Sequence, residues 1–217
     1  MKIINASYEI LSKLDGLQML KNIEKIARTC YKSETAITSG SAANMVQRLI
    51  ASGHEAMLEH QSISIKFIVD RGVSHELVRH RMASFAQEST RYCNYGKDKF
   101  NNEVTFVKPL FFKEGTYAYA TWFDACQKSE HAYLELLTNG AKPEEARTVL
   151  NNSLKTEICM TANLREWRHF FKLRAADLTG KAHPQMKEVT IPLLAELQER
   201  IPVVFDDIIV AERTHIT

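Results

Sequence analysis

The densest group of chemically capable side chains lies in one stretch of fourteen residues that begins at Arg79. The stretch reads RHRMASFAQESTRY and holds three arginines, a histidine, two serines, a threonine and a tyrosine. Arginine carries a permanent charge and five N–H donors in a fixed fork, so Arg79, Arg81 and Arg91 suit contact with phosphate. Ser89 and Thr90 add short hydroxyl groups that can reach the same anion. The stretch therefore predicts a binding site for a phosphate-bearing ligand.

Other reactive side chains have weaker claims. His54, Glu59 and His60 suggest a metal site, but the H-E-x-x-H pattern of zinc proteases needs a histidine where Leu58 stands. Because no C-x-x-C pair supplies thiolate ligands either, we expect no metal. Cys93 has no evident base beside it in the sequence, so we interpret it as a packing residue and not as a nucleophile.

The sequence near residue 167 offers both apolar and polar candidates. Trp167, Phe170 and Phe171 could stack on a flat cofactor, but aromatic residues at helical spacing more often form a core, and we predict that role. Arg165 and His169 lie one helical turn apart on another face. These two residues are the better candidates for ligand contact.

The first half of the chain must position these residues with helices and a strand. Apolar residues recur at helical spacing in 15–30 and again before Gly53, which predicts two amphipathic helices. Apolar and polar residues alternate in 62–69, the clearest strand of the sequence. A further helix is expected after Gly72 and runs into the arginine-rich stretch, so the segment 79–81 should lie at or near the C-terminal half of that helix.

In the second half of the chain, the predicted strands and helices follow one another in a less regular order. Its pattern predicts a strand over 103–108, a long helix from 118 to Gly140, a helix with Pro143 in its first turn, a strand from 154 to Asn163, a helix capped by Asn163 and Glu166, and a last long helix opened by Pro184 and containing Pro192. Since strands and helices come mixed, we expect an α+β fold with a mostly antiparallel sheet flanked by long helices.

Composition narrows the class of protein. A chain of 217 residues that is 45% hydrophobic can bury a sizeable core, and no linker divides it, so we expect one domain over residues 1–217. A net charge of +2 is too small for non-specific binding to nucleic acid across a whole face. The four cysteines form no C-x-x-C pair, and no run of 18 apolar residues occurs. We expect a soluble cytoplasmic protein without nucleic-acid or membrane partners.

The fourteen-residue stretch resembles the motif of the flavin-dependent thymidylate synthase family, in which R-H-R is followed by seven residues and a serine, with a further Arg-Tyr. The resemblance covers most of residues 54 to 186 and includes three more segments, HEAMLEH at 54–60, NLR at 163–165 with His169 and Arg174, and AHPQM at 182–186. It implies a homotetramer with active sites built from several subunits and with FAD bound outside any Rossmann fold. Neither G-x-G-x-x-G nor a P-loop motif occurs in the sequence.

The resemblance implies that a methylene group passes from 5,10-methylenetetrahydrofolate to C5 of dUMP, with reduced flavin as hydride donor and NADPH as reductant of the flavin. It assigns FAD contacts to His54, Arg79, His80, Arg81, Gln87, Asn163, Arg165 and His169. It assigns dUMP contacts to Glu76, Arg79, Gln87, Glu88, Ser89, Thr90, Arg91, Arg147 and Arg174. Arg174 would lie against the uracil, where a fixed cation favours the N3-deprotonated ring and makes C5 a better nucleophile.

Four positions depart from the family's usual pattern. Glu76 stands where Gln is common, Ala86 where Asn is common and Gln87 where Glu is common, and Ala56 lacks a hydroxyl that many relatives present. Because a carboxylate cannot donate to phosphate, we expect Glu76 on a ribose hydroxyl or in an ion pair. Two other classes of protein stay open, namely a nucleic-acid-binding module that reads with the helix ending at residue 81, and a flavoprotein sensor without activity.

Overall fold

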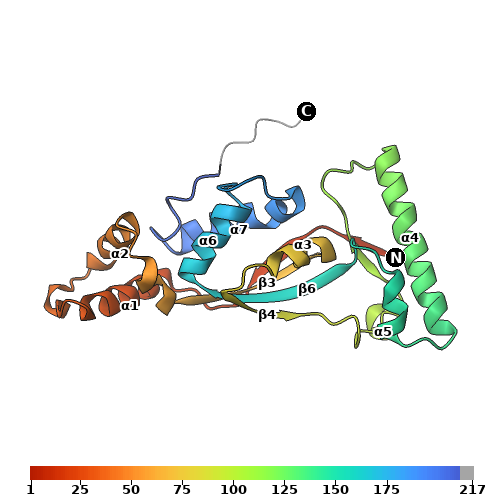
Figure 1. Ribbon diagram of the computed structural model, residues 1–217, viewed down its shortest axis with the longest axis horizontal. Helices are drawn as coiled ribbons and strands as arrows, with labels where there is room; N and C mark the ends of the chain where they lie inside the picture. Colours follow the sequence, from red (N-terminus) through yellow and green to blue (C-terminus); the bar gives the residue numbers. More distant parts are fainter. Residues whose placement is uncertain (211–217) are drawn as a thin grey trace. The chain divides into compact units, whose positions relative to one another are not determined.

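The computed structural model describes residues 1–210, which form thirteen regular helices and strands joined by short 3₁₀ turns (Figure 1). The strands are β1 (Lys2–Ile4), β2 (Ser7–Ile10), β3 (Ser62–Asp70), β4 (Ala83–Gln87), β5 (Thr105–Val107) and β6 (Lys155–Asn163). The helices are α1 (Gly16–Thr29), α2 (Ser41–Ala51), α3 (Arg71–Leu77), α4 (Tyr117–Thr138), α5 (Pro143–Ala146), α6 (Leu164–Arg174) and α7 (Pro184–Arg200). In these residues no helix is long and apolar enough to cross a bilayer.

Four strands form one sheet in the order β2-β3-β6-β4, and β1 pairs in parallel with β5 in a separate two-stranded sheet. The two central strands run antiparallel. The Arg71 N–H donates to the Leu154 carbonyl, and the Ser64 and Thr161 hydroxyls lie 2.8 Å apart, so one residue number rises as the other falls. The predicted α+β fold with a mostly antiparallel sheet and long helices is confirmed.

The chain divides into two compact units. The first unit consists of Met1–Tyr8, Lys66–Arg79 and Phe85–Cys159, and the second of Glu9–Ile65, His80–Ser84 and residues 160–210 of the described chain. Each unit therefore joins early and late parts of the sequence, and β3 and β6 contribute residues to both. The expectation of one domain over residues 1–217 stays a prediction.

Side-chain caps explain where several helices begin. Asp15 accepts a hydrogen bond from the Gln18 N–H at the start of α1, and Asn163 accepts one from the Glu166 N–H at the start of α6, as predicted. Glycine explains where others end, since Gly140 follows α4 with a φ of +90°, a conformation that costs glycine little. In this way the sequence pattern and the helix boundaries agree.

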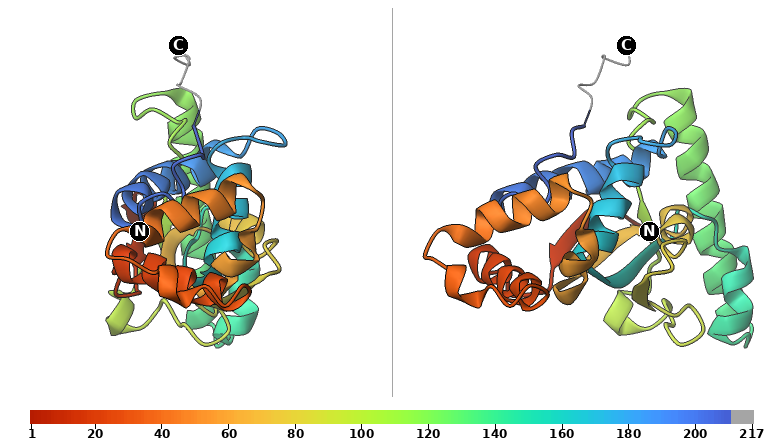
Figure 2. Two further views of the ribbon diagram at one scale, coloured as in Figure 1. Left: turned by 90° about the vertical axis from the view of Figure 1, so that its left-hand side faces the viewer. Right: turned by 60° about the vertical axis from the view of Figure 1, so that its left-hand side comes forward.

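Each unit has its own apolar core. In the first unit, Trp122, Cys126 and Tyr133 on α4 are buried with Phe106 of β5. In the second unit, α1 and α2 lie side by side (Figures 1 and 2), and the α6 aromatics Trp167, Phe170 and Phe171 are fully buried. These three rings contact one another with centroids 5.3 to 5.8 Å apart, so their predicted role as core residues is confirmed.

The arginine-rich stretch differs from the prediction in two ways. Helix α3 ends at Leu77, and the exposed Val78 caps it, so the segment 79–81 follows the helix instead of continuing it. The stretch then forms β4, an edge strand that the sequence pattern did not predict. Residues of β4 alternate only between half-buried and exposed, so the strand lacks the clear apolar alternation that revealed β3. Strands β1 and β2 were missed for the same reason.

Candidate functional site

The first unit contains a cationic pocket of about 230 Å³. Arg147 lies just after α5, and its Nη1 donates to the Thr90 hydroxyl at 3.0 Å. Arg71 at the start of α3 lines the same pocket. The full lining consists of Arg71, His75, Thr90, Arg147, Thr148, Leu150, Asn151, Asn152 and Leu154. Two guanidinium groups beside hydroxyl and amide groups make this pocket suitable for a small anion.

The segment that leads into this pocket is held by hydrogen bonds within the first unit. The Gln87 amide donates to the Ser74 hydroxyl at 2.9 Å and to the Thr156 hydroxyl at 3.2 Å. The Ser89 hydroxyl accepts from the Arg91 N–H at 3.3 Å. Arg91 itself is exposed and pairs with Glu144 on α5 at 3.1 Å. These contacts order the segment that carries the predicted phosphate ligands.

The Glu88 carboxylate accepts hydrogen bonds from other side chains of the first unit. Its carboxylate accepts from the Tyr95 hydroxyl at 2.8 Å and from the Lys155 ammonium at 3.0 Å. Burial and the neighbouring carboxylate raise the pKa of Tyr95, which therefore stays a neutral donor. Glu88 thus anchors its segment through two side chains of the same unit.

Two basic residues lie on one face of α3, and a third follows just after the helix. Arg71, His75 and Arg79 are spaced four apart, and the Arg79 Nε donates to the His75 carbonyl at 3.3 Å. The motif predicted Arg79 but missed Arg71 and His75, which line the anion pocket. The four-residue spacing of Arg71 and His75 was the sequence signal that could have revealed them. Glu76, also on α3, is half-buried.

The second unit contains another pocket, of about 320 Å³. Asn163, Arg165, Glu166 and His169 line it from α6, together with Glu55, Glu59, Met82 and Lys172. Arg165 pairs with Glu59 at 2.6 Å, with both side chains about half exposed. Three of the predicted cofactor contacts, Asn163, Arg165 and His169, therefore meet in one pocket.

His80 is buried in the same unit and touches side chains of α6. Its Nδ1 lies 3.1 Å from Glu166 Oε1, and its Nε2 lies 3.1 Å from the Nε of Arg174. Its ring makes edge contacts with Phe170 at 4.9 Å and with His169 at 5.9 Å between centroids. Burial, the Arg174 cation and His169 lower the pKa of His80 to about 4, so the imidazole is neutral at neutral pH.

All three carboxylates of this pocket have partners. Glu55 accepts from the buried Arg168 at 3.0 Å, Glu59 from Arg165, and Glu166 from His80. Pairing removes most of their repulsion for an anion. The exposed His169 and the amide of Asn163 add possible donors, so the pocket can accept a polar, partly anionic ligand.

Three groups of the second unit have metal-ligand chemistry. His80, Glu166 and His169 offer ligand atoms that all lie within 4.8 Å of one another. However, the Arg174 guanidinium already occupies His80 Nε2, and a fixed positive charge at that distance opposes a bound cation. The expectation of no metal stays a prediction.

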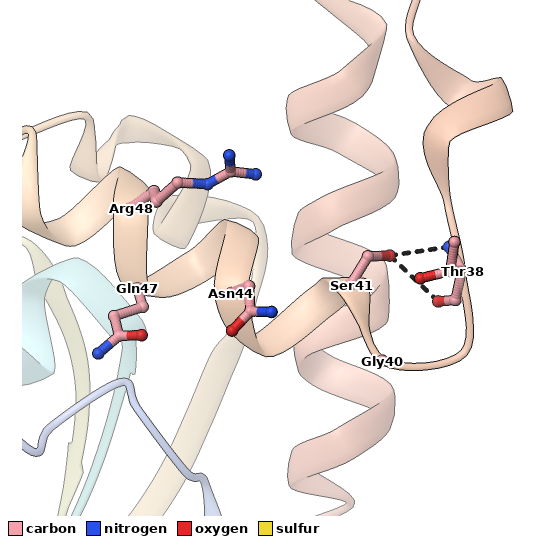
Figure 3. A pocket seen from close by; sticks show the side chains of 6 residues that line it. All are labelled: Thr38, Gly40, Ser41, Asn44, Gln47 and Arg48. Carbon is pink, nitrogen blue, oxygen red and sulfur yellow. Dashed lines mark hydrogen bonds between the residues drawn. The ribbon is translucent and has the colours of Figure 1, made fainter.

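The remaining predicted residues lie apart from these pockets. His54 is exposed at the start of the 3₁₀ turn Glu55–His60, and Arg81 is exposed after the end of α3. A larger open depression of about 680 Å³ at the start of α2 holds no predicted residue and is lined by Thr38, Gly40, Ser41, Asn44, Gln47 and Arg48 (Figure 3). The Ser41 hydroxyl in it is engaged by Thr38 and by Glu24.

The two units separate the predicted contacts by kind. Every predicted substrate residue except Arg174 belongs to the first unit, and every predicted cofactor residue except Arg79 and Gln87 belongs to the second. Arg174, at the end of α6, is half-buried. The motif therefore contributes to two chemically different sites.

Known proteins share this sequence pattern. The family model described as thymidylate synthase complementing protein matches residues 14–203. A flavin-dependent thymidylate synthase of Pyrococcus furiosus is 35% identical over 76% of this chain and 66% of its own length. One of Corynebacterium aurimucosum is 32% identical over 85% of this chain and 78% of its own length. The chain thus spans just under two thirds of the Pyrococcus furiosus relative.

A solved structure shares the fold. It is a UMP/dUMP methylase, PolB, from Streptomyces cacaoi bound with 5-Br dUMP, and it matches with a TM-score of 0.77 at 24% identity. The match covers 95% of this chain and 96% of that chain. At this identity the likeness concerns the arrangement of helices and strands.

Proposed function

This chain belongs to the thymidylate synthase complementing protein family, and we propose that it is a flavin-dependent thymidylate synthase. The proposed reaction transfers the methylene group of 5,10-methylenetetrahydrofolate to C5 of dUMP and reduces it to give dTMP, with NADPH as the final reductant. The observation that carries the proposal is the cationic pocket of Arg71, Thr90 and Arg147, which lies at the end of the family motif.

The first unit would hold the nucleotide. A dUMP phosphate carries two negative charges, and the guanidinium groups of Arg147 and Arg71 match it with several N–H donors. Ser89 and Arg91 would complete the phosphate and sugar contacts, joined by Glu76, Arg79, Gln87 and the segment around Glu88. In this reading the hydrogen bonds of Gln87 and Glu88 keep their segment rigid, which reduces the entropy lost on binding.

The second unit would hold FAD. The pocket of Asn163, Arg165 and His169 fits a flavin because it offers amide, guanidinium and imidazole donors while its carboxylates are paired. Arg81 and His54 add exposed donors for the phosphates, and the family resemblance also assigns FAD contacts to Arg79 and Gln87. When bound, the reduced flavin supplies the hydride that converts the transferred methylene group into a methyl group.

Arg174 would act on the uracil. An arginine stays protonated throughout a reaction, so it can stabilise negative charge on the pyrimidine oxygens as C5 becomes nucleophilic. His80, which is neutral and accepts the Arg174 hydrogen bond, leaves that positive charge intact.

We also propose a cytoplasmic homotetramer in which neighbouring subunits complete each active site. The family resemblance supports the tetramer. The structure describes four cysteines, Cys30, Cys93, Cys126 and Cys159, and their free thiols agree with a reducing compartment.

One assay tests the activity. Purified protein should show the visible absorbance of flavin, and anaerobic incubation with NADPH, dUMP and methylenetetrahydrofolate should yield dTMP. A colourless protein that binds DNA and not dUMP would reject the proposal. A yellow protein that binds dUMP but forms no dTMP would favour a sensor.

A further inference from the structure

One face of α6 presents Glu166, Phe170 and Arg174, spaced four residues apart. Residues at this spacing lie above one another, so Glu166 and Arg174 are separated by about 12 Å along the helix axis. The His80 ring contacts Phe170 between them and reaches both, with Glu166 at 3.1 Å from Nδ1 and Arg174 at 3.1 Å from Nε2. A carboxylate, an imidazole and a guanidinium thus form a continuous chain of hydrogen bonds.

The chemistry of these groups fixes every proton in the chain. An arginine Nε–H can only donate, so His80 Nε2 must be the acceptor and must carry a lone pair. A neutral imidazole then has its proton on Nδ1, and this N–H donates to the Glu166 carboxylate. The opposite tautomer would set two N–H donors against each other at the Arg174 end. The arrangement therefore selects one tautomer without reference to any ligand.

Among the described residues, the Glu166 carboxylate pairs with His80. The cap of α6 uses the backbone N–H of Glu166, which donates to the Asn163 side chain, and leaves the Glu166 carboxylate to His80. Glu166 is also buried, with 10% of its side chain exposed, and burial raises its pKa. A buried acid is costly to retain, which points to a role beyond helix capping.

We propose that Glu166 is a positioning residue for Arg174, acting through the single tautomer of His80. The inference rests on the proposed function, in which Arg174 stabilises charge on the uracil. Glu166 accepts from the Nδ1–H of His80, and the Nε2 of His80 accepts from the Nε–H of Arg174, which restricts the rotation of the Arg174 guanidinium group. A misoriented charged group loses much of its effect on a transition state, commonly 10- to 100-fold in rate.

The tautomer can be read directly from the purified protein. In protein labelled with ¹⁵N-histidine, the His80 nitrogens should show a protonated Nδ1 and an unprotonated Nε2 at neutral pH, with the signal assigned by its loss in His80→Gln. Observation of the Nε2–H tautomer in the unaltered protein would overturn the proposal. This readout needs neither turnover nor any variant to remain active.

Variants at Glu166 connect the tautomer to the reaction. Glu166→Ala should leave the His80 Nδ1–H without an acceptor and free the ring to turn away from Arg174, which allows a mixture of tautomers and should lower kcat for dTMP formation by about 10- to 100-fold. Glu166→Gln can still accept from Nδ1–H through its amide oxygen, so it should keep the tautomer and stay within about threefold of the unaltered rate. Flavin absorbance and circular dichroism should match in all three proteins.

A matched control separates positioning from a general loss of a buried acid. Glu24 on α1 is a buried carboxylate of the same unit, bound to Arg28 and Ser41, and Glu24→Ala should leave the His80 tautomer and kcat unchanged. If Glu166→Ala keeps the tautomer or the rate, Glu166 does not position Arg174. If the unaltered protein makes no dTMP while His80 shows the Nδ1–H tautomer, the proposed function fails and the hydrogen-bonded chain stands.

Discussion

At the scale of single residues, the two pockets use arginine in two different ways. Arg147 and Arg71 line the anion pocket. Arg168, in contrast, is buried and forms ion pairs with Glu55 and Asp207. Arg174 lies between these cases, because it is half-buried at the end of α6 and its Nε donates to His80. The surroundings of each arginine, not its residue type, decide its role.

Arg174→Ala should retain bound flavin and lose most of the turnover. The substitution removes the cation proposed to stabilise the uracil and leaves the Asn163, Arg165 and His169 pocket in place. We expect kcat to fall by about 100-fold or more, measured as dTMP formed under anaerobic conditions with saturating dUMP. Arg200→Ala, an exposed arginine on α7, serves as the control, and unchanged turnover in Arg174→Ala would remove the assignment.

His80 should make stability depend on pH in a defined window. Its pKa is about 4 in the folded protein against an ordinary value of 6.5, so the unfolded chain binds the proton more readily between these values. The stabilising contribution is complete above pH 6.5 and is lost as the pH falls toward 4. At pH 5 the expected loss is about 2 kcal/mol in the free energy of unfolding.

Urea unfolding at pH 7 and pH 5 measures this effect. The unaltered protein should lose about 2 kcal/mol more between the two pH values than His80→Asn, which cannot titrate there. His131→Asn, at an exposed histidine on α4, should behave like the unaltered protein. Equal losses in the unaltered protein and His80→Asn would contradict the expected shift.

At the scale of elements, α6 carries most of the organisation of the second unit. Its aromatic face forms the core, another face holds Glu166 and Arg174, and Arg168 reaches the turn Glu55–His60 and the carbonyl of Val204. One helix therefore sets the positions of a pocket, a core and a C-terminal segment.

Arg168→Met should destabilise the second unit. The change leaves Glu55 without its main partner and removes the hydrogen bonds to Asp207 and to the Val204 carbonyl. The expected cost is about 2 to 3 kcal/mol, below the usual range for a fully buried pair because 46% of the Asp207 side chain is exposed. Urea unfolding checks this value, and Arg165→Met, at an exposed pair, should cost under about 1 kcal/mol.

The elements that could be predicted from the sequence are those with strong local signals. The strand from Ser62 is revealed by four buried residues at period two, and α6 by a capping residue and helical spacing. Strand β4 could not be predicted, because one of its faces is only half-buried and the other is exposed, so its sequence lacks a clear apolar alternation. The predicted end of α3 was too late for a related reason. Val78 is apolar and fits the helical pattern, but in the structure it is exposed and follows the helix.

Site residues could be predicted where they belong to the motif or to its family resemblance. They could not be predicted where their place in the site depends on contacts between segments far apart in the sequence. The motif and its resemblance supplied Thr90, Arg147, Asn163 and His169, which line the two pockets. They did not supply Arg71, whose place in the anion pocket depends on how the start of α3 meets the loop at Asn152. Glu166 was foreseen as a helix cap, and its bond to His80 across 86 positions carries no local signal.

At the scale of the whole chain, the predicted substrate and cofactor residues divide between the two units. Variants should therefore fall into two classes. Arg147→Ala in the first unit should weaken dUMP binding by about 10- to 100-fold, measured by calorimetry, while flavin absorbance is kept. The loss reflects one charged hydrogen-bonding partner of a phosphate.

Arg165→Ala in the second unit should show the reverse result. Loss of its guanidinium should lower the flavin content of the purified protein, while dUMP binding in the presence of added FAD stays close to that of the unaltered protein. Lys128→Ala, at an exposed pair on α4, is the control for both measurements. A joint loss of flavin and dUMP in either variant would show that the two sets of residues do not act separately.

The interleaving of the two units also constrains how such a sequence can evolve. Each unit draws on segments from before and after β3, so a single recombination crossover between two relatives would replace part of both units at once. Hybrids would then combine foreign halves within each core and within each pocket. We expect viable diversity to arise by point substitution, as at Glu76, Ala86 and Gln87, more readily than by exchange of large blocks.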